Sequence, residues 1–80
     1  MGRTEKPLAA AVEFGARVRH RRHDREWSIE HLADEAGLHW TYVGSVERGE
    51  RNVSLQNICR LAKALGVGAE ELMAGLERRV

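Results

Sequence analysis

The sequence predicts an all-α fold built from five helices. In five successive stretches, apolar residues recur every three or four positions, which is the spacing of a helix with one buried face. Serines and glycines stand at several boundaries of these stretches, where helices commonly begin and end. No stretch alternates apolar and polar residues as a half-buried strand does. A length of 80 residues with 42% hydrophobic content suffices for one core, so we expect a single compact domain over 1–80.

The first helix is expected to run from about Pro7 to His23, because proline fits the first turn of a helix. Residues 1–6, which precede it, are expected to be flexible. No glycine marks the end of this helix, which we place between Asp24 and Glu26. Its apolar stripe consists of Leu8, Ala11, Val12, Phe14 and Val18.

Two short helices joined by a glycine-centred turn follow, which is the arrangement of a helix-turn-helix motif. Ser28 is a good N-cap for the first of them, and Gly37 stands where a left-handed residue ends a helix. The second short helix begins near Trp40 and ends at Gly49. The motif therefore spans Ser28 to Arg48. Its apolar residues are Ile29, Leu32, Ala33, Ala36, Val43 and Val46.

Ser54 is expected to cap a fourth helix that Gly66 ends, and a fifth helix is expected within the segment 67–80, from about Ala69. The single cysteine, Cys59, has no partner for an intramolecular disulfide and is expected to be a small buried residue. The residues of the fourth helix expected to face the core are Leu55, Ile58, Cys59, Leu61, Ala62 and Leu65.

The net charge of +1 conceals an uneven distribution of charged residues. A run of arginines lies within residues 17–25, where only Asp24 opposes them, and Arg48 and Arg51 form a second basic group. Such segregation allows a basic face that binds phosphates, although the run is equally consistent with a solvated helix surface. The arginines of the run are Arg17, Arg19, Arg21, Arg22 and Arg25.

A dispersed pattern of residues extends from Phe14 to Val67. It consists of Phe14-Gly15-x-Arg17-Val18-x-x-x-Arg22, Trp27-Ser28-x-x-x-Leu32-Ala33, Gly37-Leu38, Tyr42-Val43-x-x-Val46-Glu47-Arg48-Gly49 and Arg51-Asn52-x-Ser54-Leu55-x-x-Ile58-x-x-Leu61-Ala62-x-Ala64-Leu65-Gly66. This pattern resembles the phage-repressor-like helix-turn-helix family (the lambda repressor and Cro group, or XRE type). Thr41-Tyr42 and the segment from Glu47 to Leu55 are most similar to the controller proteins of restriction–modification systems. The resemblance implies a compact five-helix lambda-repressor-like domain and a sequence-specific transcriptional regulator that binds double-stranded DNA.

The second helix of the motif is expected to direct its N-terminal end into the major groove, which admits one α-helix. Thr41 and Ser45 carry hydroxyls that bind base edges or phosphate, and the indole of Trp40 fits a thymine methyl or a sugar. Tyr42 either offers its hydroxyl to a phosphate or packs toward the core. His39 replaces the serine or threonine commonly found at this N-cap, so this end of the helix is expected to be less rigid.

The other DNA contacts are expected on both sides of the reading helix. Ser28 and the free amides that open the preceding helix form an anion site for the phosphate backbone. Arg48 and Arg51 follow the reading helix and are expected to bind phosphate, or guanine if they reach the groove, and Asn52 either donates to a phosphate or stabilises the loop. Ile29 stands where the family often has glutamine, so one phosphate contact is expected to be missing.

The resemblance also implies an internal salt bridge between Arg22 and Glu47. These two residues are therefore assigned to the scaffold rather than to DNA recognition. Glu26 stands where the family has glycine, which leaves the exact end of the first helix open.

One reading helix contacts only a few base pairs, so we expect a homodimer that binds two half-sites on one face of the DNA. The expected interface consists of Leu65, Val67, Leu72, Met73 and Leu76. The alternative is that these residues complete the core of the monomer. No ligand-sensing domain is expected after the fifth helix, so regulation would follow from protein concentration, dimerisation or a partner.

Several other classes of protein are disfavoured. His20 and His23 are three positions apart, but no third metal ligand has suitable spacing. No paired nucleophile, glycine-rich phosphate loop or long apolar segment is present, so we expect no enzyme activity, metal, cofactor, small-molecule ligand or membrane attachment. No secretory signal is recognisable, and we expect a cytoplasmic protein. The main alternative is an antitoxin-like or adaptor protein that uses this fold mainly to bind another protein.

Overall fold

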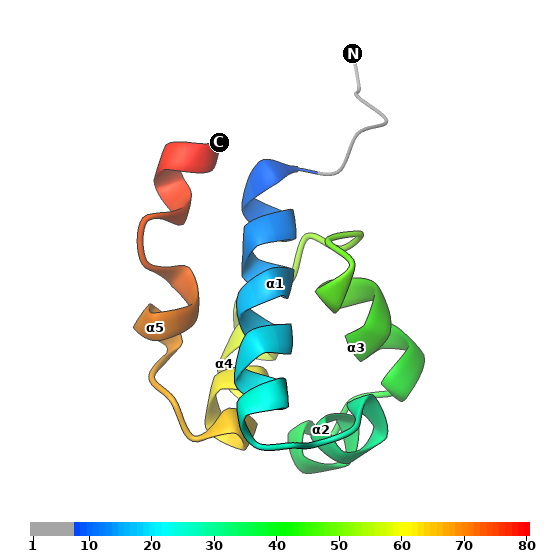
Figure 1. Cartoon of the computed structure of the whole chain (residues 1–80). Coiled ribbons are helices and arrows are strands. Elements are labelled where there is room, and N and C mark those ends of the chain that lie inside the picture. The colour runs from blue at the N-terminus through cyan, green and yellow to red at the C-terminus, as the bar shows by residue number, and fades with distance from the viewer. Residues whose placement is uncertain (1–7) are drawn as a thin grey trace.

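The structure is a computed structural model that describes residues 8–80, and in this range the predicted all-α fold is confirmed. The expected flexibility of residues 1–6 and the expected helix start at Pro7 fall outside the described residues. α1 forms the long central rod of Figure 1, with α5 on one side of it and α2 and α3 on the other. The elements are α1 (Ala9–Asp24), α2 (Ile29–Ala36), α3 (Trp40–Glu47), α4 (Leu55–Leu65), α5 (Ala69–Met73) and the 3₁₀ helix η1 (Leu76–Arg79).

The helix ends that the sequence predicts from serine and glycine are confirmed. The Ser28 and Ser54 hydroxyls each accept a hydrogen bond from the backbone N–H three residues on, at 3.0 and 3.1 Å. Gly37 and Gly66 adopt left-handed conformations, with φ of 71° and 73°, directly after the last residues of α2 and α4. Local hydrogen bonding and backbone freedom therefore set the bounds of α2 and α4.

The end of α1 is made without a glycine. Glu26 takes a left-handed conformation with φ of 59°, the only positive φ of a non-glycine residue within 8–80. A side chain in this conformation costs about 1–2 kcal/mol, because its Cβ crowds the following carbonyl. The Trp27 N–H donates to the carbonyl of Arg22 across this turn at 3.2 Å. The chain thus turns directly from α1 toward α2.

The core lies where α1, α2, α3, α4 and α5 converge. Four predicted inward positions are wrong: Leu55 is 75%, Leu8 52% and Val12 45% exposed, and Cys59 is also exposed. Helical spacing alone does not reveal which flank of a helix the rest of the fold leaves exposed. The buried apolar residues are Phe14, Val18, Leu32, Ala33, Ala36, Val43, Val46, Ile58, Leu61, Ala62, Leu65, Leu72 and Leu76.

Gly15 determines how closely α1 approaches the end of α3. A Cβ at this position would overlap the carbonyl oxygen of Val46 and lie 2.9 Å from that of Glu47. Two helical turns further along α1, Arg22 lies on the same face. The missing side chain at Gly15 therefore allows the contact that brings Arg22 to the last residue of α3.

The fifth helix is shorter than predicted, and three of the five residues predicted for the interface are buried within the monomer. Gly75, with φ of 77°, separates α5 from η1, so the segment 67–80 is not one helix. Leu65, Leu72 and Leu76 are only 2%, 0% and 7% exposed and belong to the core of the monomer. They are inaccessible because α5 and η1 pack on α1 and α4 with these side chains inward. The alternative that they complete the monomer core is correct for these three residues.

Arginines of α1 fasten this C-terminal segment. Nη1 of Arg17 donates to the carbonyl oxygen of Leu72 at 3.2 Å. Nη2 of Arg21 donates to a carboxylate oxygen of Glu71 at 2.8 Å. The first contact satisfies a carbonyl at the end of α5, where helical carbonyls lack partners. Part of the arginine run therefore stabilises the fold.

Leu72→Ala is expected to lower the free energy of unfolding by about 2–5 kcal/mol, because it leaves a cavity in the core. Met73→Ala is the matched control: Met73 is 37% exposed, so its truncation is expected to cost less. Urea denaturation of both variants measures the difference. Equally small losses of stability in the two variants would contradict the burial of Leu72 and would make it available again for the predicted interface.

Candidate nucleic-acid interface

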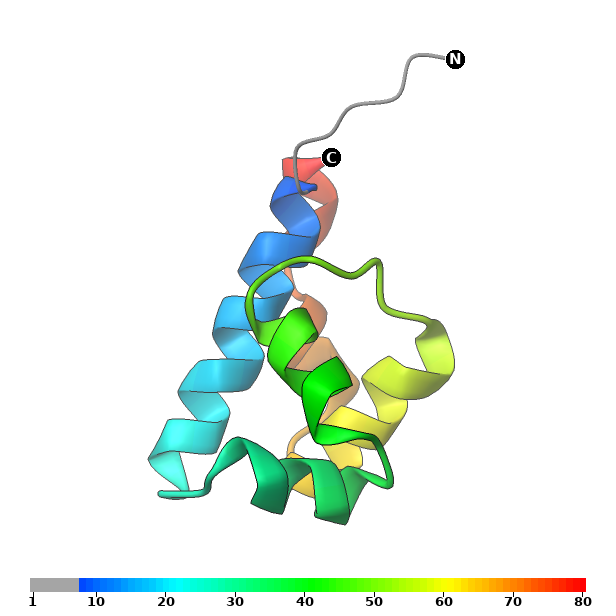
Figure 2. The same cartoon turned by 90° about the vertical axis from the view of Figure 1, so that its right-hand side faces the viewer.

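The helix-turn-helix exposes the N-terminal end of α3. α2 lies across the foot of α3 in Figure 2, and the turn at Gly37 connects them. Trp40 is 52% exposed, and Thr41 and His39 are also exposed. The predicted accessibility of these three residues is confirmed. The end of α3 that the sequence assigns to DNA reading is therefore open to solvent.

His39 caps α3, contrary to the expectation of a less rigid end. Its Nδ1 accepts a hydrogen bond from the Thr41 N–H at 3.2 Å and lies 2.7 Å from the Thr41 hydroxyl oxygen. An imidazole nitrogen thus takes the role that a serine or threonine oxygen usually has at an N-cap. The His39 ring also stacks on Trp40, with centroids 6.0 Å apart. Cap and indole form one aromatic pair at the tip of α3.

Ser45 does not face outward as predicted, since it is only 5% exposed. Its hydroxyl donates to the carbonyl oxygen of Tyr42 at 2.6 Å and accepts from Nε of Arg51 at 2.9 Å. The whole second half of α3, from Val43 to Glu47, is buried. The prediction treated α3 as a helix with one exposed face along its whole length. In the structure α3 packs on α1 and α2, and only its first turn is exposed to solvent.

Tyr42 is half-buried, and its hydroxyl has a partner inside the protein. Nδ2 of Asn57 on α4 donates to it at 3.1 Å. Packing toward the core, one of the two alternatives for Tyr42, is thus observed for the ring. The sequence analysis missed Asn57. No local signal identifies it, because its partner lies 15 residues away and only the crossing of α3 and α4 brings them together.

Two arginines and an asparagine follow α3 on the exposed loop, as predicted. Arg48 binds the Glu50 carboxylate through Nε at 3.0 Å and Nη2 at 3.3 Å. This hydrogen bonding raises the pKa of Arg48 and lowers the pKa of Glu50. Arg51 has no carboxylate partner within 8–80, and its guanidinium carbon lies 5.6 Å from the centre of the Tyr42 ring. Arg51 therefore differs from Arg48 in that no carboxylate within the described residues competes with a phosphate for its guanidinium, and the neighbouring Asn52 is uncharged.

The N-terminus of α2 is exposed beside this surface. Ser28 itself is exposed, and its hydroxyl caps the helix through the His31 N–H. The first amides of α2 have no carbonyl partner within the helix, which favours an anion at this end. Ile29 is half-buried and packs against the core, so it has no polar role at this site.

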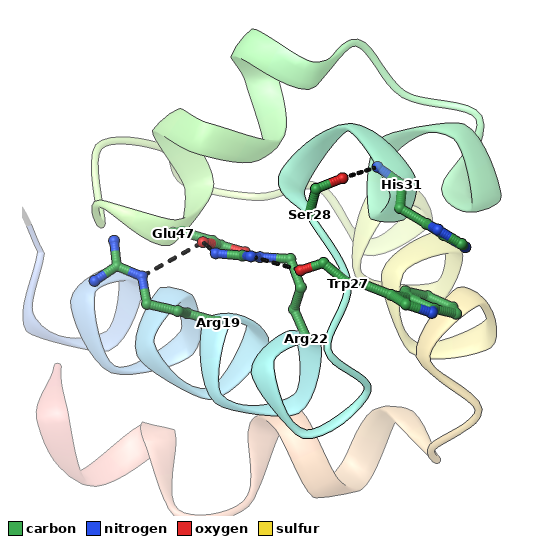
Figure 3. Close-up of polar contacts among 6 residues, drawn as sticks. All are labelled: Arg19, Arg22, Trp27, Ser28, His31 and Glu47. Carbon is green, nitrogen blue, oxygen red and sulfur yellow. Dashed lines mark hydrogen bonds and ion pairs between the residues drawn. The ribbon is translucent and has the colours of Figure 1, made fainter.

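The predicted salt bridge between Arg22 and Glu47 is present and buried. Nε and Nη2 of Arg22 donate to the two carboxylate oxygens of Glu47 at 2.7 and 2.9 Å. Nη1 donates to the carbonyl oxygen of Trp27 at 2.9 Å, as Figure 3 shows. Hydrogen bonding to Glu47 raises the pKa of Arg22 against the opposing effect of burial. Arg19 adds a longer contact to the same carboxylate, at 3.4 Å.

The rest of the arginine run also makes internal contacts, which favours neither of the two alternatives proposed for it. Nε of Arg25 donates to the carbonyl oxygen of Leu65 at 3.1 Å, and its guanidinium lies 4.7 Å from the centre of the Trp27 ring. Trp27 stacks in turn on His31, with ring centroids 4.3 Å apart (Figure 3). These arginines connect α1 to the other helices.

Comparison with known proteins identifies close relatives. A family model described as a helix-turn-helix domain matches residues 13–75. Over 61 residues the chain is 49% identical to control protein C.BamHI of Bacillus amyloliquefaciens, which covers 75% of each protein. Over 56 residues it is 50% identical to control protein C.SmaI of Serratia marcescens, which covers 70% of this chain and 67% of that protein.

The fold comparison agrees. The crystal structure of the restriction–modification controller protein C.AhdI from Aeromonas hydrophila superposes with a TM-score of 0.78 and 52% sequence identity. The match covers 80% of this chain and 97% of C.AhdI. The resemblance predicted from the sequence is thus confirmed. Within the described residues, no helix is both long and apolar enough to cross a membrane.

Glu47→Ala is expected to lower the free energy of unfolding by about 3–5 kcal/mol, because it leaves the Arg22 charge buried without its partner. Glu50→Ala is the control, since it removes a carboxylate from an exposed arginine pair instead. Urea denaturation monitored by circular dichroism gives both values. A Glu47→Ala protein that unfolds like the wild type would contradict the structural role of the pair.

Proposed function

The chain belongs to the helix-turn-helix family of transcriptional regulators, and we propose that it acts as the controller protein of a restriction–modification system. As a member of this family it binds DNA and is not an enzyme. The finer proposal is supported by 49% and 50% identity to two control proteins. The geometric observation that supports DNA binding is the exposed first turn of α3, flanked by the N-terminus of α2 and the loop that carries Arg48 and Arg51. A transcriptional regulator acts where the DNA is, which agrees with the cytoplasm as its location.

In this proposal the tip of α3 reads the bases. Trp40 is 52% exposed and offers a broad apolar face to a thymine methyl or a sugar. The Thr41 hydroxyl and methyl reach base edges from the same turn, and the His39 ring supports the indole. Tyr42 contributes its hydroxyl at the margin of this surface, although Asn57 already binds it.

The phosphate backbone is held on both sides of α3. Ser28 and the first amides of α2 bind phosphate on one side. Arg51 and Asn52 bind it on the other side, from the exposed loop. Arg48 joins them when a phosphate replaces its Glu50 partner, since an exposed ion pair contributes little stability in water. Contacts of this type fix the position of the protein, and the contacts to base edges give specificity.

Two copies of the chain bind two half-sites in this proposal, because one short reading helix covers only a few base pairs. Of the five residues predicted for the interface, Met73 is exposed and Val67 is half-buried, so only these two remain available. Met73 lines an apolar groove between the start of α1 and η1. The other apolar residues of the groove are Leu8, Ala10, Ala11, Phe14, Val53, Ile58, Leu76 and Val80, and Arg51, Asn52 and Glu77 also line it.

Selection of duplexes from a random pool, followed by titration with salt, tests the function. A specific regulator enriches one sequence, and the logarithm of its affinity falls with the logarithm of salt concentration by about 0.9 for each phosphate contact. The affinity for the selected duplex is expected to exceed that for random duplex by about 10³-fold or more. Binding without such discrimination would favour an antitoxin-like or adaptor protein.

Trp40→Ala is expected to weaken binding to the selected duplex by roughly 1–2 kcal/mol, because one base contact is lost. The stability of the protein is expected to change little, since the indole is exposed. Val12→Ala removes another exposed apolar side chain, on α1, and serves as the control. Fluorescence anisotropy measures both affinities. Equal affinities of the two variants would exclude Trp40 from the DNA surface.

Met73→Glu is expected to raise the dissociation constant of the dimer roughly tenfold or more, because it places a charge in an apolar contact. Leu55→Glu is the control, since Leu55 is 75% exposed and does not line the groove. Sedimentation equilibrium measures the association of each variant. A dimer that survives Met73→Glu but not Leu55→Glu would place the interface at the start of α4.

A further inference from the structure

The loop arginine Arg51 is held by a residue that is itself hidden from solvent. Nε of Arg51 donates to the Ser45 hydroxyl oxygen at 2.9 Å, although Arg51 lies on the exposed loop and Ser45 is only 5% exposed. The guanidinium carbon lies 5.6 Å from the centre of the Tyr42 ring. The inner edge of the guanidinium is thus in contact with α3 from two directions.

The Ser45 hydroxyl has a fixed orientation. It donates its hydrogen to the carbonyl oxygen of Tyr42 at 2.6 Å, one turn earlier in α3. A hydroxyl has one hydrogen to donate, so its lone pairs are left to accept from Nε of Arg51. Because the donor and acceptor roles are both assigned, the direction from which Arg51 approaches is set by α3.

Tyr42, whose ring lies next to the Arg51 guanidinium, is itself bound to α4. Nδ2 of Asn57 donates to the Tyr42 hydroxyl at 3.1 Å, which links α4 to α3. The loop that carries Arg51 connects these same two helices. This hydrogen bond therefore joins the first turn of α3 to the first turn of α4, into which the loop leads.

The two terminal nitrogens of the same guanidinium, Nη1 and Nη2, make no hydrogen bond to the described part of the chain. Arg48, in contrast, has its Nε and Nη2 on Glu50. An arginine offers its terminal nitrogens as a planar fork that matches a phosphate or the edge of guanine. Both terminal nitrogens of Arg51 are thus free to form such a fork, whereas Nη2 of Arg48 is already bound to Glu50.

We propose that Ser45 is a positioning residue for DNA binding, which holds the guanidinium of Arg51 through Nε so that its terminal nitrogens are aimed at the DNA. This inference rests on the proposed function. Ser45 thus acts without touching DNA, which replaces its predicted role as a base reader. The benefit is that an arginine fixed before binding loses less side-chain freedom when the complex forms.

A double-mutant cycle with Ser45→Ala and Arg51→Ala on the selected duplex tests this proposal. Ser45→Ala is expected to weaken binding roughly threefold to tenfold in the wild-type background, which corresponds to fixing one flexible side chain. It is expected to have no effect in the Arg51→Ala background, because there is no guanidinium left to position. In the Arg48→Ala background, the matched control, the full effect of Ser45→Ala is expected to persist.

Two results would overturn the proposal while DNA binding stands. One is a Ser45→Ala effect of the same size with and without Arg51, which would indicate a direct contact or a loss of fold. The other is Arg51→Ala binding as tightly as the wild type. Failure to select any duplex would instead refute the proposed function itself.

The free protein gives an independent measurement. The Arg51 Nε–H is expected to exchange slowly with water in wild-type ¹H–¹⁵N spectra and faster in Ser45→Ala, while the thermal unfolding midpoint changes little. If Ser45 only stabilises the fold, Ser45→Ala would change the unfolding midpoint, and its effect on DNA binding would not depend on Arg51. Unchanged exchange of the Arg51 Nε–H in Ser45→Ala would refute the positioning, whatever the DNA result.

Discussion

The helix-turn-helix depends on one guanidinium. Arg22 binds both carboxylate oxygens of Glu47 and the carbonyl oxygen of Trp27, so it connects the last turn of α1, the end of α3 and the entry to α2 (Figure 3). Two buried charges are costly unless each is paired and hydrogen-bonded, and here each of the three guanidinium nitrogens has a partner. This one side chain therefore joins α1 to α3 and to the segment that enters α2.

This anchoring explains why only the tip of α3 is available for DNA. The second half of α3 is buried against α1 and α2, with Gly15 allowing the close approach at its end. The first turn remains exposed to solvent. There the His39 imidazole caps the helix, and Trp40 presents an exposed indole. A rigid helix end with a short exposed surface suits a major groove that admits one helix.

The arginines of the basic run all contact other parts of the protein. Those of α1 and Arg25 directly after it bind Glu71 of α5, Glu47 at the end of α3 and the carbonyl of Leu65 at the end of α4. The run therefore has structural roles in a chain whose net charge is only +1. In the proposed complex, phosphate binding then falls to a few groups around α3. Arg51 is one of them, and its Nε is bound by the buried Ser45, beside a Tyr42 that is itself linked to Asn57.

The sequence by itself determined the helices and the exposure of the first turn of α3, which we propose reads the DNA, since both depend on near neighbours. Serine caps, left-handed glycines and apolar spacing act within a few residues, and they predicted the bounds of α2 and α4 correctly. The pair Arg22–Glu47 was predicted from the family resemblance. Only the tertiary structure decided which face of each helix is covered. Ser45 and Leu72 are buried because of how α3 and α5 cross their neighbours, and such crossings join residues too far apart in the chain for any local pattern to reveal.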